Sequence, residues 1–362
     1  MAIIIFFMPN GLFCRYMKNT FSYLSLICIC LLSLVSCDWF NKNTKKIDVS
    51  AIDLNLAIDR FDQSFFSADT NNLYASLAKV RQQDSSFFDF YTINVMRFGP
   101  ISDTLSPTML DLNHFFTNPY VLDLYDTVQV YYGDITPLKE ELTEAMKHFK
   151  YYFPNKELPH FKTMISEFGY NAVALDSAFI ALSLDMYLGR EYMYYGSFDF
   201  PNYLIRRFQA EYIVPNAMEV LFNAYFAPDE LTETDALIHA MIEKGKLHYF
   251  KECMQPEKEK HILIGYTKEQ YDWCEDAEGE IWKFYNEHDL FYSKNYMEHS
   301  RHIGEGPLTA GMPEQAPGNV GSWVGWQIVN QYMEKVEENI SLREMLETPP
   351  AVILGKSNYK PK

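Results

Sequence analysis

The chain has 362 residues, of which 48% are hydrophobic and 16% aromatic, so it is long enough to build a substantial core. It carries 48 acidic residues against 31 basic ones. Because binding to phosphate backbones needs a cationic face, this balance excludes nucleic acid as an expected partner. The sequence contains no Walker motif and no dinucleotide-binding glycine loop, and we expect no cofactor.

The N-terminal region has the sequence pattern of a lipoprotein signal peptide. The stretch "MKNTFSYLSLICICLLSLVSC" begins at Met17, and its apolar run over residues 21–35 is too short for a comfortable transmembrane span. It ends in the lipobox "LVSC", whose last residue is Cys37. We therefore predict a signal peptide over residues 17–36 and a lipid on Cys37 that holds the protein to a membrane. An uncleaved anchor is the alternative.

The flanking segments complete the expected organisation. Residues 1–16 fit no signal peptide and are interpreted as a misassigned upstream start. Residues 37–46, "CDWFNKNTKK", are a polar tether, and no later linker or repeat divides the chain. Residues 47–362 are therefore expected to form a single globular domain.

Two cysteines, Cys253 and Cys274, remain in the expected domain. In an oxidising periplasm they could form a disulfide, but sequence spacing does not show that they meet. Two separate buried thiols are an equally good interpretation.

The first half of the domain is expected to combine helices with a few strands. The stretch "IDVSAIDLNLAIDRF" has a period of two through Ile52, Leu54, Leu56 and Ile58 and predicts a strand, after which "RFDQSFF" predicts a helix. Residues 71–149 are expected to be largely helical, with breaks near Gly99-Pro100 and at Pro119. Three further strands are predicted by "FKTMISEF", "AVALD" and "SAFIALSLDMYLG", the last ending at Gly189.

The second half is expected to be a run of helices. A helix from about Pro201 is followed by Pro215, which either kinks it or begins a new helix that ends at Phe226. Helices are then predicted over residues 230–254, 271–292 and 318–336, and the capping box of Ser341 and Glu344 opens a short one. The inward faces of the first two contain Ile238, Met241, Ile242, Gly245 and Tyr249, and Trp273, Ala277, Ile281 and Tyr285. Separate runs of strands and helices indicate an α+β fold, mostly helical with a small mixed sheet.

One acid, Glu219, lies in the apolar helical stretch "EYIVPNAMEVLFNAYF". A zinc-peptidase helix carries His-Glu-x-x-His because two histidines four residues apart chelate one metal, while the glutamate polarises the metal-bound water. The same frame here reads Met218-Glu219-Val220-Leu221-Phe222. A thioether is a poor zinc ligand and a phenyl ring is none, so this frame does not predict a zinc site. Taken alone, it is an acid in a core helix.

Several longer segments give this frame a context. They are "RFDQSFF", "LDMYLG", "YIVPNAMEVLFNAYF", "GYTKEQYDWCEDAEGEIWKFYNEHDLFY" and "PGNVGSWVGWQIVNQYM", together with the lipobox. With them the mature chain, over nearly its whole length, resembles the gliding-motility lipoprotein family of Bacteroidota, the GldB family. That family in turn looks like a relative of predicted zinc proteases of the zincin type. The resemblance implies a zincin-like domain.

The resemblance also implies a vestigial metal site. In the zinc-binding relatives, a glutamate that precedes a glycine on the second helix is the third ligand, and the matching residue here is Lys244, before Gly245. The ligand positions Met218, Phe222 and Lys244 are thus all unsuited to zinc, and only Glu219 is kept. We hypothesise that Glu219 pairs with Lys244 across the former metal site.

Two other groups of residues could bind a metal. His239 and Glu243 are four residues apart, and Glu298, His299 and His302 form a second run. Acids and histidines are also common on solvated helix faces, which is the simpler interpretation of both. No G-x-S-x-G nucleophile elbow occurs.

Three functions remain open at this point. The first is a non-catalytic cell-envelope lipoprotein, a zincin-like pseudoenzyme scaffold that acts by binding or assembly. The resemblance implies a role near gliding motility and its secretion machinery. Apart from the resemblance, we expect envelope protein partners and a position in the outer membrane, facing the periplasm. The second is an active envelope hydrolase with a displaced metal site. The third is a glycan- or peptide-binding surface lipoprotein, suggested by the aromatic content.

Overall fold

The computed structural model describes residues 47–226, 236–336 and 340–362, and these belong to one compact unit. The predictions for the signal peptide, for Cys37 and for the tether lie outside the described residues, as does the start of the helix expected over residues 230–254. In the described part of the chain, none of the helices is both long and apolar enough to cross a membrane.

A small four-stranded sheet lies at the centre of the described residues. Its strands are β1 (Ile58–Asp59), β2 (His160–Met164), β3 (Ala172–Leu175) and β4 (Phe179–Ser183), in the order β1-β2-β4-β3. β2 runs parallel to both β1 and β4, whereas β3 and β4 form an antiparallel pair. The predicted α+β class with a small mixed sheet is confirmed.

Three predicted strands are shorter than expected, and the one predicted by "FKTMISEF" ends at Met164 as β2. Residues 47–57 have no regular secondary structure, although from Ile52 onward partly or fully buried side chains alternate with exposed ones. Only β1, which follows this segment, pairs with β2. The strand expected to reach Gly189 ends at Ser183, and a 3-10 helix, Leu184–Tyr187, follows. The chain turns there because the buried Asp185 accepts hydrogen bonds from the backbone N–H groups of Ser166 and Phe168 instead of continuing the strand.

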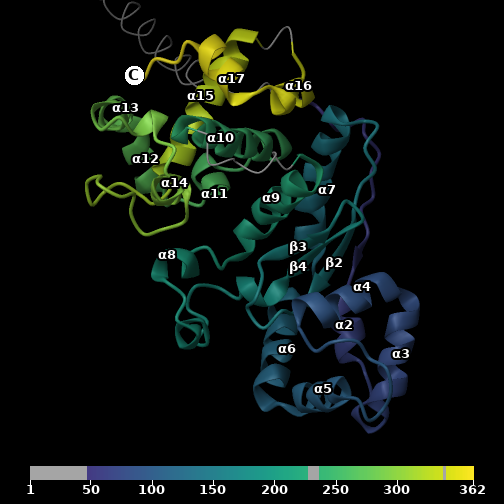
Figure 1. Cartoon of the computed structure of the whole chain (residues 1–362). Coiled ribbons are helices and arrows are strands. Elements are labelled where there is room, and N and C mark those ends of the chain that lie inside the picture. Colours follow the sequence, from purple (N-terminus) through teal and green to yellow (C-terminus); the bar gives the residue numbers. More distant parts are fainter. Residues whose placement is uncertain (1–46, 227–235, 337–339) are drawn as a thin grey trace, which may run out of the picture. The chain divides into compact units, whose positions relative to one another are not determined.

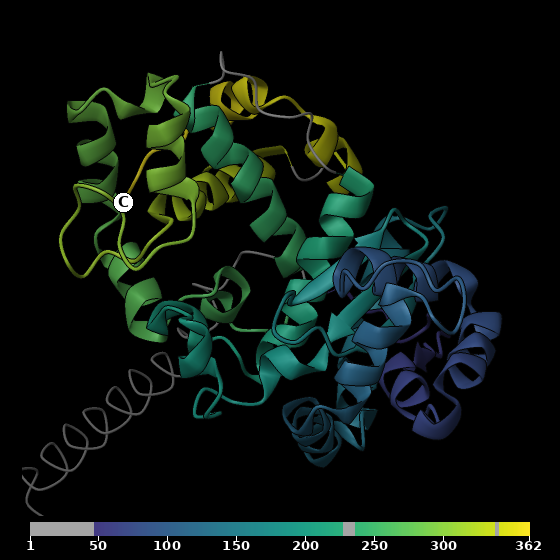
Figure 2. The same cartoon turned by 60° about the horizontal axis from the view of Figure 1, so that its bottom comes forward.

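The first half of the domain contains a run of helices. They are α2 (Phe61–Phe66), α3 (Leu73–Gln83), α4 (Ser85–Phe90), α5 (Pro107–Thr117), α6 (Pro119–Tyr132) and α7 (Thr136–Tyr152). The predicted breaks are confirmed, since Gly99 has a positive φ and α6 begins at Pro119. The helices α2 to α5 enclose an aromatic core that includes Phe61, Phe65, Phe87, Phe88 and Phe115. Figures 1 and 2 show α2–α6 and the later helices α10–α17 on opposite sides of the sheet.

The stretch "RFDQSFF" anchors α2 to the sheet through a buried acid. Asp62 accepts two hydrogen bonds from the guanidinium of Arg60, at 3.0 and 2.8 Å, one from Gln129 at 3.1 Å, and one from the hydroxyl of Thr163. Burial acts to raise the pKa of Asp62, but these donors outweigh it and the pKa is lowered. The carboxylate therefore joins α2, α6 and β2.

The second half is helical, as predicted. Its helices are α8 (Asn202–Ile205), α9 (Ile213–Phe226), α10 (Leu237–Met254), α11 (Lys260–Ile264), α12 (Lys268–Asp276), α13 (Glu278–Glu287), α14 (Tyr296–Ile303), α15 (Val320–Val336), α16 (Leu342–Glu347) and α17 (Pro350–Ser357). Pro215 lies in the first turn of α9, where its missing N–H has no helical partner to lose, so it belongs to a new helix. The capping box of Ser341 and Glu344 is confirmed.

The single helix expected over residues 271–292 is in fact two, α12 and α13, separated at Ala277. Glycine weakens a helix, and Gly279 follows the break; a side chain there would meet the backbone of Lys362 at 3.0 Å. The hydroxyl of Tyr359 also donates to Glu278. The C-terminal segment therefore packs against the junction, and the predicted inward residues Ile281 and Tyr285 are buried on α13.

The helices α10 and α15 cross at two glycines. A Cβ on Gly245 would lie 2.2 Å from the carbonyl carbon of Gly325, and a Cβ on Gly325 would lie 1.7 Å from the carbonyl oxygen of Met241. The backbones thus touch without intervening side chains. The face of α10 predicted to point inward is buried throughout, from Ile238 to Tyr249.

Candidate functional site

A polar cavity of about 150 Å3 lies where α9, α10 and the beginning of α15 meet. Glu219 comes from α9, and Ser322 comes from the first turn of α15. The helix α10 supplies Lys244, His248 and Lys251, which are four and three residues apart and so share one helix face. The glutamate of the degenerate frame therefore faces a real cavity.

Glu219 forms an ion pair with Lys251, and not the hypothesised one with Lys244. The Nζ atom of Lys251 lies 3.4 Å from Oε2 of Glu219, and the side chains are 5% and 42% exposed. Burial acts to raise the pKa of Glu219, but Lys251 and Lys244 outweigh it and the pKa is lowered. Burial lowers the pKa of Lys251, against the attraction of Glu219. Lys251 is favoured as the partner because it is buried beside Glu219, whereas Lys244 is exposed.

A second ion pair lies at the same cavity. The guanidinium of Arg207 donates to both carboxylate oxygens of Glu305, at 3.2 and 2.8 Å. Lys244 has no ion-pair partner among residues 47–226, 236–336 and 340–362. Burial and the two lysines lower the pKa of His248 well below its ordinary value, so its ring is neutral. The described lining thus holds three cations and two carboxylates, an excess of one positive charge.

Three buried polar atoms of this lining have no hydrogen-bond partner within the described structure. They are Nδ1 of His248, Oδ1 of Asn319 and Oγ of Ser322. The three residues are 5%, 8% and 1% exposed, and the His248 ring is tilted against that of Trp326 at 5.5 Å. Buried polar groups in folded proteins are nearly always hydrogen-bonded. Three such atoms around one cavity indicate a site for a polar occupant.

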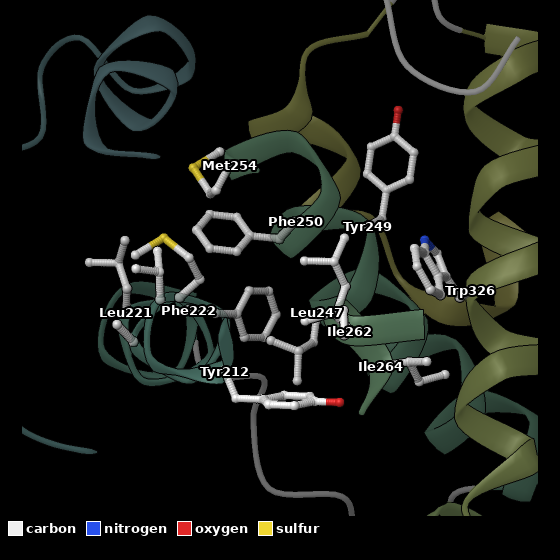
Figure 3. Packing of buried hydrophobic residues seen from close by; sticks show 14 of the residues in the cluster. Tyr212, Leu221, Phe222, Leu247, Tyr249, Phe250, Met254, Ile262, Ile264 and Trp326 are labelled. Carbon is white, nitrogen blue, oxygen red and sulfur yellow. The ribbon is translucent and has the colours of Figure 1, made fainter. Parts of the chain in front are cut away.

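Met218 and Phe222 are part of the hydrophobic core. They are 0% and 3% exposed, and the Phe222 ring lies 5.5 Å from that of Phe250. Figure 3 shows Phe222 of α9 next to Phe250 and Met254 of α10. Of the four vestigial positions, only Glu219 and Lys244 line the cavity.

Four of the five alternative metal-binding residues contact other groups, which differ from one residue to the next. The carboxylate of Glu243 pairs with Lys246 at 2.8 Å, and Glu298 accepts a hydrogen bond from the hydroxyl of Ser293. The ring of His299 bonds the backbone oxygen of Ser293 at 2.9 Å, and that of His302 lies 3.3 Å from the hydroxyl of Tyr285. His239 is half-buried at the start of α10. Within the described residues, no three His, Cys, Asp or Glu side chains are grouped so that they could hold a metal ion.

The two cysteines are free and buried. Burial raises the pKa of both the Cys253 and the Cys274 thiol. Of the two interpretations that the sequence left open, the structure has the separate thiols.

A larger cavity of about 430 Å3 is lined by residues 47–50, by α7 and by residues 254–258. It is rich in carboxylates and also has unpartnered atoms, on His148 and Gln255. We place the candidate site at the smaller cavity because only there do the glutamate frame, two ion pairs and an unpaired cation come together.

Sequence reasoning missed Lys251, His248, Arg207, Asn319 and Ser322. A usable signal was present for two of them, because positions 244, 248 and 251 recur on one face of a predicted helix. Nothing in the sequence placed the other three beside that face, since they come from distant segments.

A family model described as gliding motility protein GldB matches residues 42–361. No curated protein and no solved structure matches the chain.

Proposed function

The chain belongs to the gliding motility protein GldB family, and from this premise we propose that it is a non-catalytic cell-envelope lipoprotein that acts by binding or assembly. The observation that carries the proposal is the ion pair between Glu219 and Lys251. This ion pair holds the carboxylate that would act as the general base in a zincin-type hydrolysis.

The chemistry of the frame supports binding over hydrolysis. A general base works best when its pKa lies near the working pH, whereas Lys251 and Lys244 hold the pKa of Glu219 below its usual range. Met218 and Phe222 lie in the core and offer no ligand for a metal that would activate water. We propose that this is a zincin-like scaffold whose catalytic cleft has been repacked. Two features support descent from a zincin: Glu219 on α9, and the consecutive residues Lys244 and Gly245 on α10.

The proposed location follows from the N-terminal sequence. The lipobox that ends at Cys37 supports a lipid anchor, and the polar tether after it supports a domain held close to a membrane. We propose the outer membrane with the domain facing the periplasm, and protein partners in the envelope near the gliding and secretion machinery.

A glycan-binding role has less support. Trp323 and Trp326 are 1% and 0% exposed, while Trp273 and Trp282 are partly buried. Stacking on sugars needs exposed aromatic faces, and these four tryptophans are used for packing.

The substitution Glu219→Gln tests the non-catalytic proposal. In a gliding host that lacks its own family member, the variant is expected to restore colony spreading to within about twofold of the wild-type chain, after normalisation to abundance. Abundance is expected to fall modestly, because Lys251 loses its charged partner, at a cost of roughly 1–3 kcal/mol. Spreading is measured on soft agar, and abundance by immunoblot.

Glu252→Gln is the control, since Glu252 is an acid of α10 that also pairs with a lysine, Lys260, at 3.0 Å, but does not line the cavity. Both variants are expected to behave alike. Because Glu219 also lines the cavity, loss of spreading at normal abundance in Glu219→Gln alone contradicts the non-catalytic proposal when the variant still binds the ligand of that cavity.

A further inference from the structure

We infer that the polar cavity between α9, α10 and α15 binds one small carboxylate group carried on a short aliphatic stem. The inference rests on the proposed function, since it names the ligand class of a site that binds and does not hydrolyse.

The charge of the cavity favours a monoanion. Glu219 and Glu305 neutralise Lys251 and Arg207, which leaves Lys244 as the excess positive charge of the described lining. Lys244 is exposed and lies on the same helix face as the buried Lys251. An anion that enters past Lys244 therefore meets a second ammonium group deeper in the site. A polyanion would bring more charge than the lining compensates.

Two of the three unpartnered polar atoms, on Ser322 and His248, favour an acceptor as the occupant. The Ser322 hydroxyl can donate a hydrogen bond, and neutral His248 can carry its proton on Nδ1 and donate as well. Ser322 is in the first turn of the 17-residue helix α15, where the helix dipole favours negative charge. Charge-assisted hydrogen bonds to a carboxylate would satisfy these two donors. The amide oxygen of Asn319 can only accept, so a carboxylate leaves it without a partner.

The apolar walls of the cavity limit the size of the ligand and favour an aliphatic stem on it. Leu247, Ile262, Leu263 and Ile264 line the cavity beside the charged groups. Figure 3 shows Leu247, Ile262 and Ile264 near Tyr212, which also lines it. A volume of about 150 Å3 has room for a carboxylate with a few carbon atoms. Two sources have this chemistry, a free short-chain acid and the C-terminal carboxylate of a peptide.

Calorimetric titration of the full chain in detergent tests the inference. Propionate is expected to bind saturably with one site per chain, and Lys244→Met is expected to weaken it at least tenfold. Lys283→Met, which removes an exposed lysine of α13, is the matched control and is expected to leave the affinity unchanged. Binding that is absent from the wild-type chain, or equal in the two lysine variants, overturns the inference.

Ser322→Ala separates ligand binding from folding. Because the hydroxyl has no partner in the described structure, its removal is expected to leave the Tm of the ligand-free chain unchanged or higher. The same change is expected to weaken propionate binding at least threefold. A variant that melts lower and binds propionate as tightly as wild type overturns the assigned role of Ser322.

Three further ligands identify the chemistry and its source. Inorganic phosphate is expected to bind more weakly than propionate, and tighter phosphate binding overturns the carboxylate assignment. Alanyl-alanine that binds while its C-terminal amide does not supports a peptide terminus, whereas binding of propionate alone supports a free acid. If no carboxylate binds but Glu219→Gln still restores spreading, the ligand inference fails and the proposed function stands.

Discussion

Replacing Gly325 with alanine is expected to destabilise the chain by about 3 kcal/mol or more, because overpacking a core contact costs about 1–3 kcal/mol and here the obstacle is backbone. The added Cβ would lie 1.7 Å from the carbonyl oxygen of Met241 and 2.3 Å from its carbonyl carbon. No side-chain rotation relieves such a clash, so α10 and α15 must move apart. Urea unfolding followed by circular dichroism measures the loss.

Gly355→Ala is the matched control for this prediction. Gly355 lies in α17, is exposed, and has open space where its Cβ would be. Alanine is favoured over glycine in a helix by roughly 0.5–1 kcal/mol, so this variant is expected to be slightly more stable than wild type. If Gly325→Ala is also neutral or stabilising, the close crossing of α10 and α15 is wrong.

The helical part of the fold was predictable from sequence because its signals are local. The apolar spacing along α10 and α15, the prolines at the starts of α6 and α9, and the capping box before α16 all act within one or two turns. The predictions that were wrong concern elements whose ends depend on residues distant in the sequence. The strand expected to reach Gly189 is ended by a carboxylate that binds a neighbouring loop, and the break between α12 and α13 faces the C-terminal segment.

Part of the candidate site was also predictable from local sequence, whereas the pairing of its residues was not. The frame singled out Glu219, which does line the cavity, and the resemblance singled out Lys244, which lines it too. Which lysine pairs with Glu219 depends on how α9 packs on α10. Lys251 is seven residues, or nearly two turns, beyond Lys244 on the same face, and sequence alone does not fix that offset.

The turn after β4 contains a second buried acid whose protonation is expected to change stability strongly with pH. Asp185 is 0% exposed, and its carboxylate accepts backbone hydrogen bonds from Ser166 at 3.1 Å and from Phe168 at 2.7 Å. Burial raises the pKa of Asp185 to about 7, although these hydrogen bonds oppose the rise. In the unfolded chain an aspartate has a pKa of about 3.9.

This difference in pKa fixes the sign of the pH effect. Between about pH 4 and pH 7 the folded chain holds the Asp185 proton and the unfolded chain does not, so rising pH favours unfolding. The contribution of Asp185 to the free energy of unfolding is fully present below its pKa in the unfolded chain. It is lost as the pH rises through its pKa in the folded chain, near 7. With about 1.4 kcal/mol per pKa unit, the loss between pH 5 and pH 8 is about 3 kcal/mol.

The substitution Asp185→Asn removes this titration and keeps the shape of the side chain. The free energy of unfolding of wild type minus that of the variant is therefore expected to fall by about 3 kcal/mol from pH 5 to pH 8. The other titrating groups are common to both chains and largely cancel in the difference. Glu167 cancels only in part, because its charge acts on Asp185 and raises the pKa of that residue. Carbon-13 resonances of the aspartate carboxyl groups give a direct check, since one that titrates near pH 7 should disappear in the variant. A difference in stability that stays constant over this range would show that Asp185 remains ionised in its buried turn, with its two backbone donors outweighing the effect of burial.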